Sequence, residues 1–248
     1  MNPTEYAAMF AVEDRHWWYL GVRREVERWL DGLRPVGSGR LRVLDAGCGT
    51  GGLLANLRTS AWRAGVEISP AGIGLARSRG LRALVLGSVC ALPFTEASFD
   101  AVVSIDVLCQ SGVEELPALE EAARVLRPGG LLLLQVPAFD WLRGEHDVAV
   151  WTKRRYRRTE AVELLSAAGL SALRAGYRNA LLFPAAAIVR LASRRAGTRE
   201  AARSDVRPVP APVNALLSGV LALERKLGIP FPFGLSVFCV AEKPQESP

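Results

Sequence analysis

Residues 43–52 read VLDAGCGTGG, a short aliphatic run that leads into a glycine-rich turn. Gly47, Gly49 and Gly52 satisfy the spacing GxGxxG, which is typical of the turn between the first strand and the first helix of a nucleotide-binding α/β unit. Glycines at such a turn allow the backbone to approach a ligand closely. The spacing predicts a fold class but does not distinguish between nucleotide-containing ligands.

Two acidic residues narrow the choice of ligand. Asp45 stands two positions before Gly47, where a carboxylate would repel a pyrophosphate at short range but would suit an ammonium group. Glu67 ends the next aliphatic run, a place where a carboxylate accepts hydrogen bonds from both ribose hydroxyls. Together they indicate a ligand with an amino acid at one end and adenosine at the other, although Glu67 would serve a nicotinamide cofactor equally well.

Outward from the glycine turn, short aliphatic runs alternate with helical stretches, which indicates βαβ units and a mostly parallel sheet. The predicted strands cover residues 41–46, 63–67, 82–86, 99–105, 131–136, 172–177 and 235–241. The predicted helices among the first six strands cover residues 51–58, 70–79, 113–126 and 159–168. We therefore expect an α/β protein with one doubly wound, seven-stranded sheet.

Two segments lie outside this alternation. Residues 1–40 contain apolar residues at helical spacing after an aromatic cluster at 16–19, so we expect a helical arm or lid. Residues 179–234 are expected to form a helical insert before the last strand, with two helices and a proline-containing linker. Few large apolar side chains occur in residues 194–213, which predicts a mobile stretch. The core then comprises residues 41–178, completed by the final strand and tail at 235–248.

The composition excludes several classes of protein. Half of the 248 residues are hydrophobic and 23% are charged, which matches a folded domain and not a disordered chain. The four cysteines are scattered and the chain has two histidines, so we expect neither a zinc site nor a disulfide framework. The N-terminus lacks a signal-peptide pattern, and the longest apolar stretch, 180–189, falls short of the roughly 20 residues that span a bilayer. We expect a soluble, cytoplasmic protein.

The net charge of +6 is concentrated in the last part of the chain. Residues 1–140 contain 14 basic and 16 acidic side chains, whereas residues 141–248 contain 17 and 9. A basic half favours contact with anionic lipid, nucleic acid or a phosphorylated substrate, or it is only a solvated face rich in arginine. Arginines flank the apolar part of the insert, so its helices shape a ligand pocket or contact a membrane from its surface.

Five blocks in a fixed order carry a resemblance to a known family. They read VLDAGCGTGG at 43–52, VEIS at 66–69, GSVCALPF at 87–94, SFDAVVSIDVL at 98–108 and RVLRPGGLLLLQVP at 124–137. This combination resembles the class I S-adenosylmethionine-dependent methyltransferases, in the branch called methyltransferase domain type 11. Outside the core, DRHWWYLGVRR, the HD...RRY element at 146–156 and PFGLSVF are similar to a subgroup of that family.

The resemblance implies a Rossmann-like fold and S-adenosylmethionine as the cofactor, with S-adenosylhomocysteine as its product. It implies that the glycine turn lines the methionine part of the cofactor, with Asp45 beside the amine. The residues of that turn are Gly47, Cys48, Gly49 and Gly51.

On the adenosine side, the resemblance implies that Glu67 holds the ribose and Ile68 lies against the adenine. The family often has an aspartate after Gly87, whereas this chain has Ser88. Adenine contact is therefore expected from the Ser88 hydroxyl and the Val89 backbone. Asp106 is expected to face the cleft between the methionine part and the methyl acceptor.

Fewer residues indicate the acceptor side. His146 is the candidate general base, or else a loop histidine that orders its segment through backbone hydrogen bonds. Many relatives read DVLEH after the fourth strand, whereas this chain reads DVLCQ at 106–110, so a histidine base or metal ligand is missing there. We expect Gln110, Trp18 and Tyr156 to contact the acceptor. No metal is expected.

The aromatic arm has two interpretations. Tyr19 closes over the cofactor while Arg23 or Arg24 reaches the cofactor's carboxylate, or the aromatic residues only fix the arm to the sheet.

These observations predict a methyltransferase that acts on a small-molecule or lipid-like acceptor, with oxygen as the first choice of acceptor atom. Methylation of carbon or nitrogen in a natural-product scaffold is the alternative, and a non-catalytic cofactor-binding or membrane-surface partner protein is the alternative of another class. The basic run KRRYRR at 153–158 is typical of nucleic-acid contact, but the fourth strand lacks the (N/D)PP(Y/F) turn with which enzymes of this fold grip a base. We therefore do not expect a nucleic-acid partner.

Overall fold

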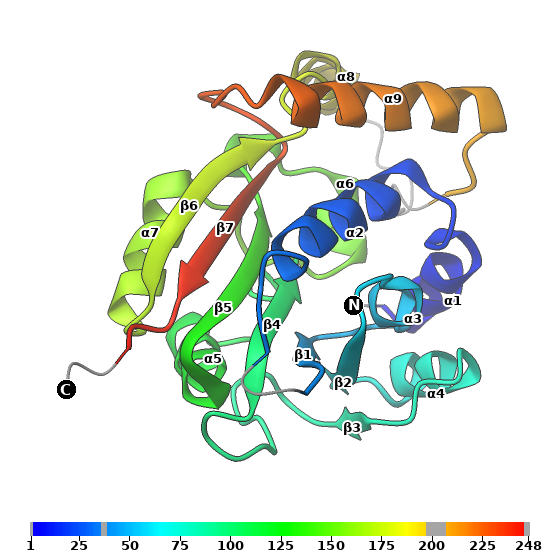
Figure 1. Cartoon of the computed structure of the whole chain (residues 1–248). Helices are drawn as coiled ribbons and strands as arrows, with labels where there is room; N and C mark the ends of the chain where they lie inside the picture. Colours follow the sequence, from blue (N-terminus) through cyan, green and yellow to red (C-terminus); the bar gives the residue numbers. More distant parts are fainter. Residues whose placement is uncertain (1, 36–38, 197–206, 246–248) are drawn as a thin grey trace.

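The computed structural model describes residues 2–35, 39–196 and 207–245. Its described strands form one sheet in the order β3-β2-β1-β4-β5-β7-β6 (Figure 1). These strands are β1 (Leu41–Ala46), β2 (Ala61–Glu67), β3 (Leu84–Leu86), β4 (Phe99–Ile105), β5 (Leu126–Pro137), β6 (Ser171–Arg178) and β7 (Ser236–Glu242). The first five pair in parallel, whereas β7 runs antiparallel between β5 and β6. The prediction of a seven-stranded, mostly parallel sheet is confirmed.

Helices cover both faces of the sheet. They are α1 (Pro3–Val12), α2 (Trp17–Leu30), α3 (Gly52–Asn56), α4 (Pro70–Ser78), α5 (Glu115–Val125), α6 (Glu145–Ala149), α7 (Arg158–Ala167), α8 (Phe183–Ala196) and α9 (Ala211–Leu227). On one face, Leu54 of α3 and Ile73 of α4 share a buried cluster with Val103 of β4. On the other face, Leu119 of α5 and Leu165 of α7 share a cluster with sheet residues. This two-sided covering is the doubly wound arrangement.

The N-terminal arm is helical, as expected, and lies beside the carboxyl edge of the sheet. The side chain of Asn2 caps α1, and Nδ1 of His16 accepts a hydrogen bond from the Trp18 amide at the start of α2. The aromatic cluster therefore forms the cap and first turn of α2 and does not precede that helix. Asn214 of α9 bridges to this turn, because its Oδ1 accepts from the Trp17 amide at 2.8 Å and its Nδ2 donates to the Arg15 carbonyl at 2.9 Å.

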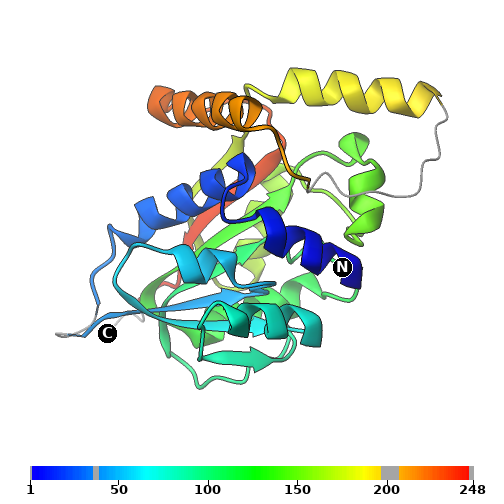
Figure 2. The ribbon, with the colours of Figure 1, turned by 90° about the vertical axis from the view of Figure 1, so that its right-hand side faces the viewer.

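The insert contains two helices, as predicted, and they form a layer across the top of the molecule in Figure 2. Part of the expected mobile stretch, residues 197–206, lies outside the described residues, whereas residues 211–213 belong to α9. Within the described ranges, no helix combines the length and the apolar character that crossing a membrane requires.

Two boundaries differ from the sequence prediction for identifiable reasons. β5 begins at Leu126, because Leu126 pairs with Phe99 and Arg127 forms an ion pair with Asp100. The segment after β5, predicted as a loop, contains the short helix α6. Asp147 accepts a hydrogen bond from the Gly144 amide at 2.8 Å, which closes the first turn of that helix.

Candidate active site

The glycine turn after β1 has a backbone that side chains would not allow. Gly47, Gly49 and Gly51 have φ values of +91°, +54° and +77°. A Cβ on Gly47 would lie 2.3 Å from a methyl carbon of Val107, so the turn also packs tightly against the segment after β4. The amides of Gly47 and Cys48 both donate to the Val66 carbonyl, at 2.8 and 2.9 Å. These contacts join the carboxyl ends of β1, β2 and β4 in one place.

Two buried carboxylates flank this turn. Asp45 is 3% exposed at the end of β1, and Glu67 is 6% exposed at the end of β2. Burial, together with the charges of Glu67 and Glu13, raises the pKa of Asp45 to about 8. Glu67 Oε2 accepts from the Gly49 amide and Oε1 accepts from the Ser69 amide, each at 2.9 Å. Asp45 and Glu67, which the sequence predicted to act at one site, thus lie near each other at the glycine turn.

The arm contributes residues that the sequence analysis did not single out. Tyr6 is buried and donates to Glu67 Oε1 at 2.8 Å. Glu13 accepts from the hydroxyl of Thr50 and forms an ion pair with Arg79 at 2.8 Å. Met9 lies against Gly49, since a Cβ there would meet its terminal methyl at 2.8 Å. Tyr6, Met9 and Glu13 follow helical spacing, which is the sequence signal that would have identified this face.

Asp106 follows β4 at the same edge of the sheet. Its φ is +54°, a strained value for a residue with a side chain. Its Oδ1 is shielded from solvent and has no hydrogen-bond partner among the described residues, while Oδ2 lies 3.4 Å from the amide nitrogen of Gln135. Burial raises the pKa of this carboxyl to about 7. A strained, buried and half-satisfied carboxylate at this edge is typical of a functional group.

Gln110 places a second unsatisfied oxygen in the same segment. Its amide nitrogen donates to the Asp106 carbonyl at 3.1 Å, and its Oε1 is buried without a partner in the described chain. Both orphaned atoms are acceptors. They therefore suit a molecule that presents hydroxyl or amine donors.

A small cavity, about 30 Å³ in volume, lies between α2, α9 and the sheet. Trp18, Gln135, Arg178, Leu221 and Phe238 are among its lining residues. Gln135 connects the cavity to Asp106 through its amide nitrogen. Tyr19 lies near Asp106 and Glu13, and burial together with these charges raises the pKa of its phenol above the usual range. Arg23 is partly exposed on α2.

The residues expected to contact adenine lie beyond Glu67. Ile68 is 71% exposed, so its side chain is accessible to a planar ring. Ser88 Oγ accepts from the Cys90 amide at 3.1 Å, which orders the turn after β3. Val89 is partly buried and packs against the core.

Tyr156 and His146, both predicted for the acceptor side, lie outside the group formed by Asp106 and Gln110. Tyr156 is fully buried. Its hydroxyl oxygen lies 2.7 Å from a carboxylate oxygen of Glu115 and 3.1 Å from the Leu108 carbonyl oxygen, so it packs against the segment after β4. His146 is on α6, where its neighbour Asp147 pairs with Arg155 through both carboxylate oxygens, at 2.8 and 3.0 Å. Both carboxylate oxygens of Asp147 are therefore used by Arg155.

The arrangement fits S-adenosylmethionine on chemical grounds. Its ammonium and sulfonium groups are cations, and the edge of the sheet gathers the carboxylates of Asp45, Glu67 and Asp106. The glycine turn leaves room for a ligand backbone, and Ile68 presents an apolar surface next to Glu67. Within the described ranges, no cluster of three or more His, Cys, Asp or Glu side chains is arranged to hold a metal.

Comparison with known proteins agrees with this chemistry. Residues 44–134 match the family model of a methyltransferase domain. The chain is 37% identical over 123 residues to the tRNA (carboxymethyluridine(34)-5-O)-methyltransferase of Arabidopsis thaliana, which covers 49% of this chain and 29% of that protein. It is 36% identical over 169 residues to the malonyl-[acyl-carrier protein] O-methyltransferase of Erwinia pyrifoliae, covering 64% of this chain and 62% of that protein. The match thus spans less than two thirds of either relative.

A solved structure shares the fold along the whole chain. It is the methyltransferase in complex with the Trm112 methyltransferase activator of Haloferax volcanii, with a TM-score of 0.63 and 22% identity, over 99% of this chain and 96% of that one. At this identity the likeness concerns the fold alone. The match of residues 44–134 to a methyltransferase domain, the shared fold and the acid-lined glycine turn agree with one another, and together they support a methyltransferase domain that uses S-adenosylmethionine.

Proposed function

We propose that this protein methylates an oxygen atom of a small-molecule or lipid-like acceptor. The observation that carries the proposal is the pair of orphaned acceptor atoms, Asp106 Oδ1 and Gln110 Oε1, at the carboxyl end of β4. The bound cofactor supplies an electrophilic methyl group. The protein's tasks are to hold the acceptor in line, to exclude water and to remove a proton.

The cofactor is held at the glycine turn in this proposal. Asp45 faces the ammonium group, Glu67 accepts hydrogen bonds from the ribose, and Gly47, Gly49 and Gly51 allow close backbone approach. Tyr6 and Met9 of α1 cover the turn and keep water away from it. Tyr19 and Arg23 of α2 belong to the same cover.

Asp106 is the proposed general base. A hydroxyl must lose its proton as it is methylated, and a carboxyl with a pKa of about 7 accepts a proton efficiently near neutral pH. Gln110 Oε1 orients the acceptor through a second hydrogen bond. His146 is the alternative base predicted from the sequence, and it provides a direct comparison in the test below.

The cavity lined by Trp18 and Gln135 is the proposed acceptor pocket. It has a volume of about 30 Å³, room for about one water molecule, so the proposal requires α9 to move outward there to admit the acceptor. Its lining residue Gln135 contacts Asp106, and the lining contains apolar side chains such as Leu221 and Phe238, together with the guanidinium of Arg178. Arg178 forms an ion pair with Glu25, so the pocket itself carries little net charge. This composition favours a largely apolar acceptor with a polar group.

The internal pairing of the basic run supports a small acceptor over a nucleic acid. Lys153 and Arg154 pair with Glu115, Arg154 also pairs with Glu160, and Arg155 pairs with Asp147. These cations neutralise carboxylates of this chain. Carboxylates beside them weaken the attraction that a phosphate backbone would feel.

The proposed location is the cytoplasm, at or near a membrane surface. All four cysteines lie in the described part of the chain and are free, which favours a reducing compartment. The apolar exposure of the insert helices favours the membrane contact.

The test compares Asp106→Asn with His146→Gln. Each purified variant is assayed for binding of S-adenosylhomocysteine by calorimetry and for transfer of labelled methyl groups to fractions of a cell extract. We expect Asp106→Asn to keep its affinity within about threefold and to lose about 10²- to 10⁴-fold in transfer. His146→Gln serves as the matched variant and is expected to retain transfer.

Label in the lipid or small-molecule fraction supports the proposal, and alkali-labile label would identify an ester oxygen. Label in RNA would contradict the acceptor class. Tight cofactor binding without transfer to any fraction would favour the non-catalytic alternative.

A further inference from the structure

Helix α8 presents its apolar side chains to solvent. Ile188 and Val189 are 68% and 66% exposed, and Pro184, Ala185 and Ala192 are exposed on the same face, at steps of three and four residues. Ala187 is buried on another side of the helix. A globular helix normally shows the reverse pattern, with its apolar face toward the core.

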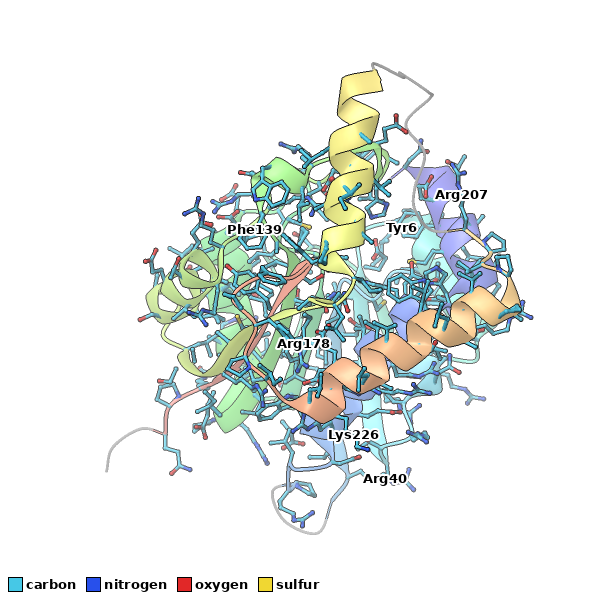
Figure 3. The ribbon with its side chains drawn as sticks, turned by 90° about the horizontal axis from the view of Figure 1, so that it is seen from above. Tyr6, Arg40, Phe139, Arg178, Arg207 and Lys226 are labelled. Carbon is cyan, nitrogen blue, oxygen red and sulfur yellow. The ribbon has the colours of Figure 1, made fainter. Side chains whose placement is uncertain are left out.

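Helix α9 repeats this arrangement. Leu221 and Glu224 are buried on the side that faces α2, where Leu221 packs so closely that a Cβ on Gly21 would lie 2.6 Å from it. On the exposed side, Leu216, Leu223 and Leu227 are 67%, 52% and 47% exposed. We call the two helices together the α8–α9 layer. Figure 3, seen from above, shows that both lie outermost on this side of the molecule.

The insert that forms this layer is rich in basic residues. The insert at 179–234 has eight basic and three acidic residues. In its described ranges, 179–196 and 207–234, the one carboxylate is Glu224, which is buried and accepts a hydrogen bond from the Leu181 amide. Arg207, four residues before α9, and Lys226, in the last turn of α9, are both exposed, and Figure 3 labels both.

Aromatic side chains extend the apolar surface at the base of α8. Phe183 contacts Trp141 and Phe233 with ring centroids 5.7 and 5.0 Å apart. Trp141 is 45% exposed and Phe233 is 36% exposed. Aromatic rings are favoured at the boundary between hydrocarbon and water, because one part of the ring is apolar while its edge tolerates polar groups.

We propose that the α8–α9 layer binds the surface of an anionic lipid bilayer, with its exposed leucine, isoleucine and valine side chains in the interface and its basic residues near the lipid headgroups. Amphipathic helices with a cationic border bind such surfaces. In a second copy of this chain, the described part of the insert would offer no exposed carboxylate to pair with these basic residues. The inference extends the proposed location and pocket, since α9 also covers the acceptor cavity.

The test uses the full purified chain and large unilamellar vesicles, without cofactor or acceptor. We expect flotation with vesicles that contain phosphatidylglycerol and phosphatidylcholine, at least about tenfold weaker binding to phosphatidylcholine alone, and weakening of the anionic binding as salt is raised. Because methyl transfer is not measured, failure here leaves the proposed reaction untouched, and failure of the reaction leaves this result standing.

Substitutions in the α8–α9 layer test whether this surface is the one that binds the vesicles. Leu216→Gln with Ile188→Gln, and separately Arg207→Glu with Lys226→Glu, are each expected to weaken binding to anionic vesicles at least about tenfold. Leu173→Gln on β6, which is 54% exposed in the original chain, is the matched apolar control, and Arg40→Glu before β1 is the charge control. Thermal melting checks that every variant is folded.

Two results would overturn the proposal. One is a folded chain that stays with the unbound fraction, or layer variants that float as well as the controls. The other is a dimer in light scattering that Leu216→Gln converts to a monomer, which would assign the surface to a second copy of the chain.

Discussion

The sheet and the α8–α9 layer are built from the same kinds of side chain and use them in opposite ways. Leu133 and Val103 in the sheet are fully buried, whereas Leu216 and Ile188 in the layer are more than two-thirds exposed. In the sheet, burial of apolar area stabilises the fold of this chain. In the layer, folding of the chain does not bury this apolar area. Contact with a molecule outside the chain could still bury it.

The largest difference in the free energy of unfolding is expected between a leucine-to-alanine substitution in the sheet and the same substitution in the α8–α9 layer. Leu133→Ala removes a fully buried side chain from β5 and is expected to lower the free energy of unfolding by about 2 to 5 kcal/mol. Leu216→Ala in α9 is expected to change it by less than about 0.5 kcal/mol. Urea denaturation of the two variants measures the difference. Equal losses would show that α9 is packed as a core helix and would remove the contrast.

A second pair compares glycines. Gly47→Ala places a side chain at φ +91° and against Val107, and we expect a loss of about 2 to 4 kcal/mol together with loss of S-adenosylhomocysteine binding. Gly219→Ala in α9 meets no atom within 4 Å and is expected to stabilise the helix by about 0.5 to 1 kcal/mol. Denaturation and calorimetry on both variants are the measurement, and full binding by Gly47→Ala would contradict the proposed role of the turn.

The third prediction concerns pH at the buried carboxylates. Asp45 must be ionised to pair with an ammonium group, and its pKa in the unliganded protein is about 8. We expect S-adenosylhomocysteine to bind at least about tenfold more weakly at pH 6.5 than at pH 8. Asp45→Asn should bind weakly at both values, so its dependence on pH should be flatter.

The same groups have an opposite effect on the stability of the unliganded protein. Their pKa values in the folded state lie above the unfolded value, because burial disfavours the charged form. Folding therefore favours the protonated forms, and the contribution of Asp45 and Asp106 to stability falls as pH rises from about 4 to about 8. Asp106→Asn should remove part of that fall in a series of thermal melts.

The smallest expected effect is at the contact between the arm and Glu67. Glu67 Oε1 already accepts hydrogen bonds from Tyr6 and from the Ser69 amide, so ribose hydroxyls must compete with the phenol. Tyr6→Phe is expected to tighten S-adenosylhomocysteine binding by about threefold to tenfold. Tyr177→Phe on β6 is the control and should leave affinity unchanged. Weaker binding by Tyr6→Phe would show that the phenol contacts the cofactor directly.

The sequence allowed prediction of the sheet because each strand has a continuous apolar run and each turn has its own glycine or cap. It also brought together Asp45, Glu67 and Asp106, since each ends a strand and parallel strands end at one edge. The contacts of Tyr6 and Glu13 were not predictable in this way, because they depend on how α1 docks against residues 61 and 37 positions further along the chain. The burial of Tyr156 was missed for a related reason: its ring fills space beneath the loop after β4.

Asn214 links the α8–α9 layer to the N-terminal arm. Its amide group ties α9 to the bend between the arm helices, and the arm in turn touches the glycine turn through Tyr6 and Glu13. A shift of α9 must either break these two hydrogen bonds or carry the bend along. If binding at the glycine turn shifts the arm, this tether would transmit the shift to α9, and any effect on the proposed attachment of α9 to a surface would be reciprocal.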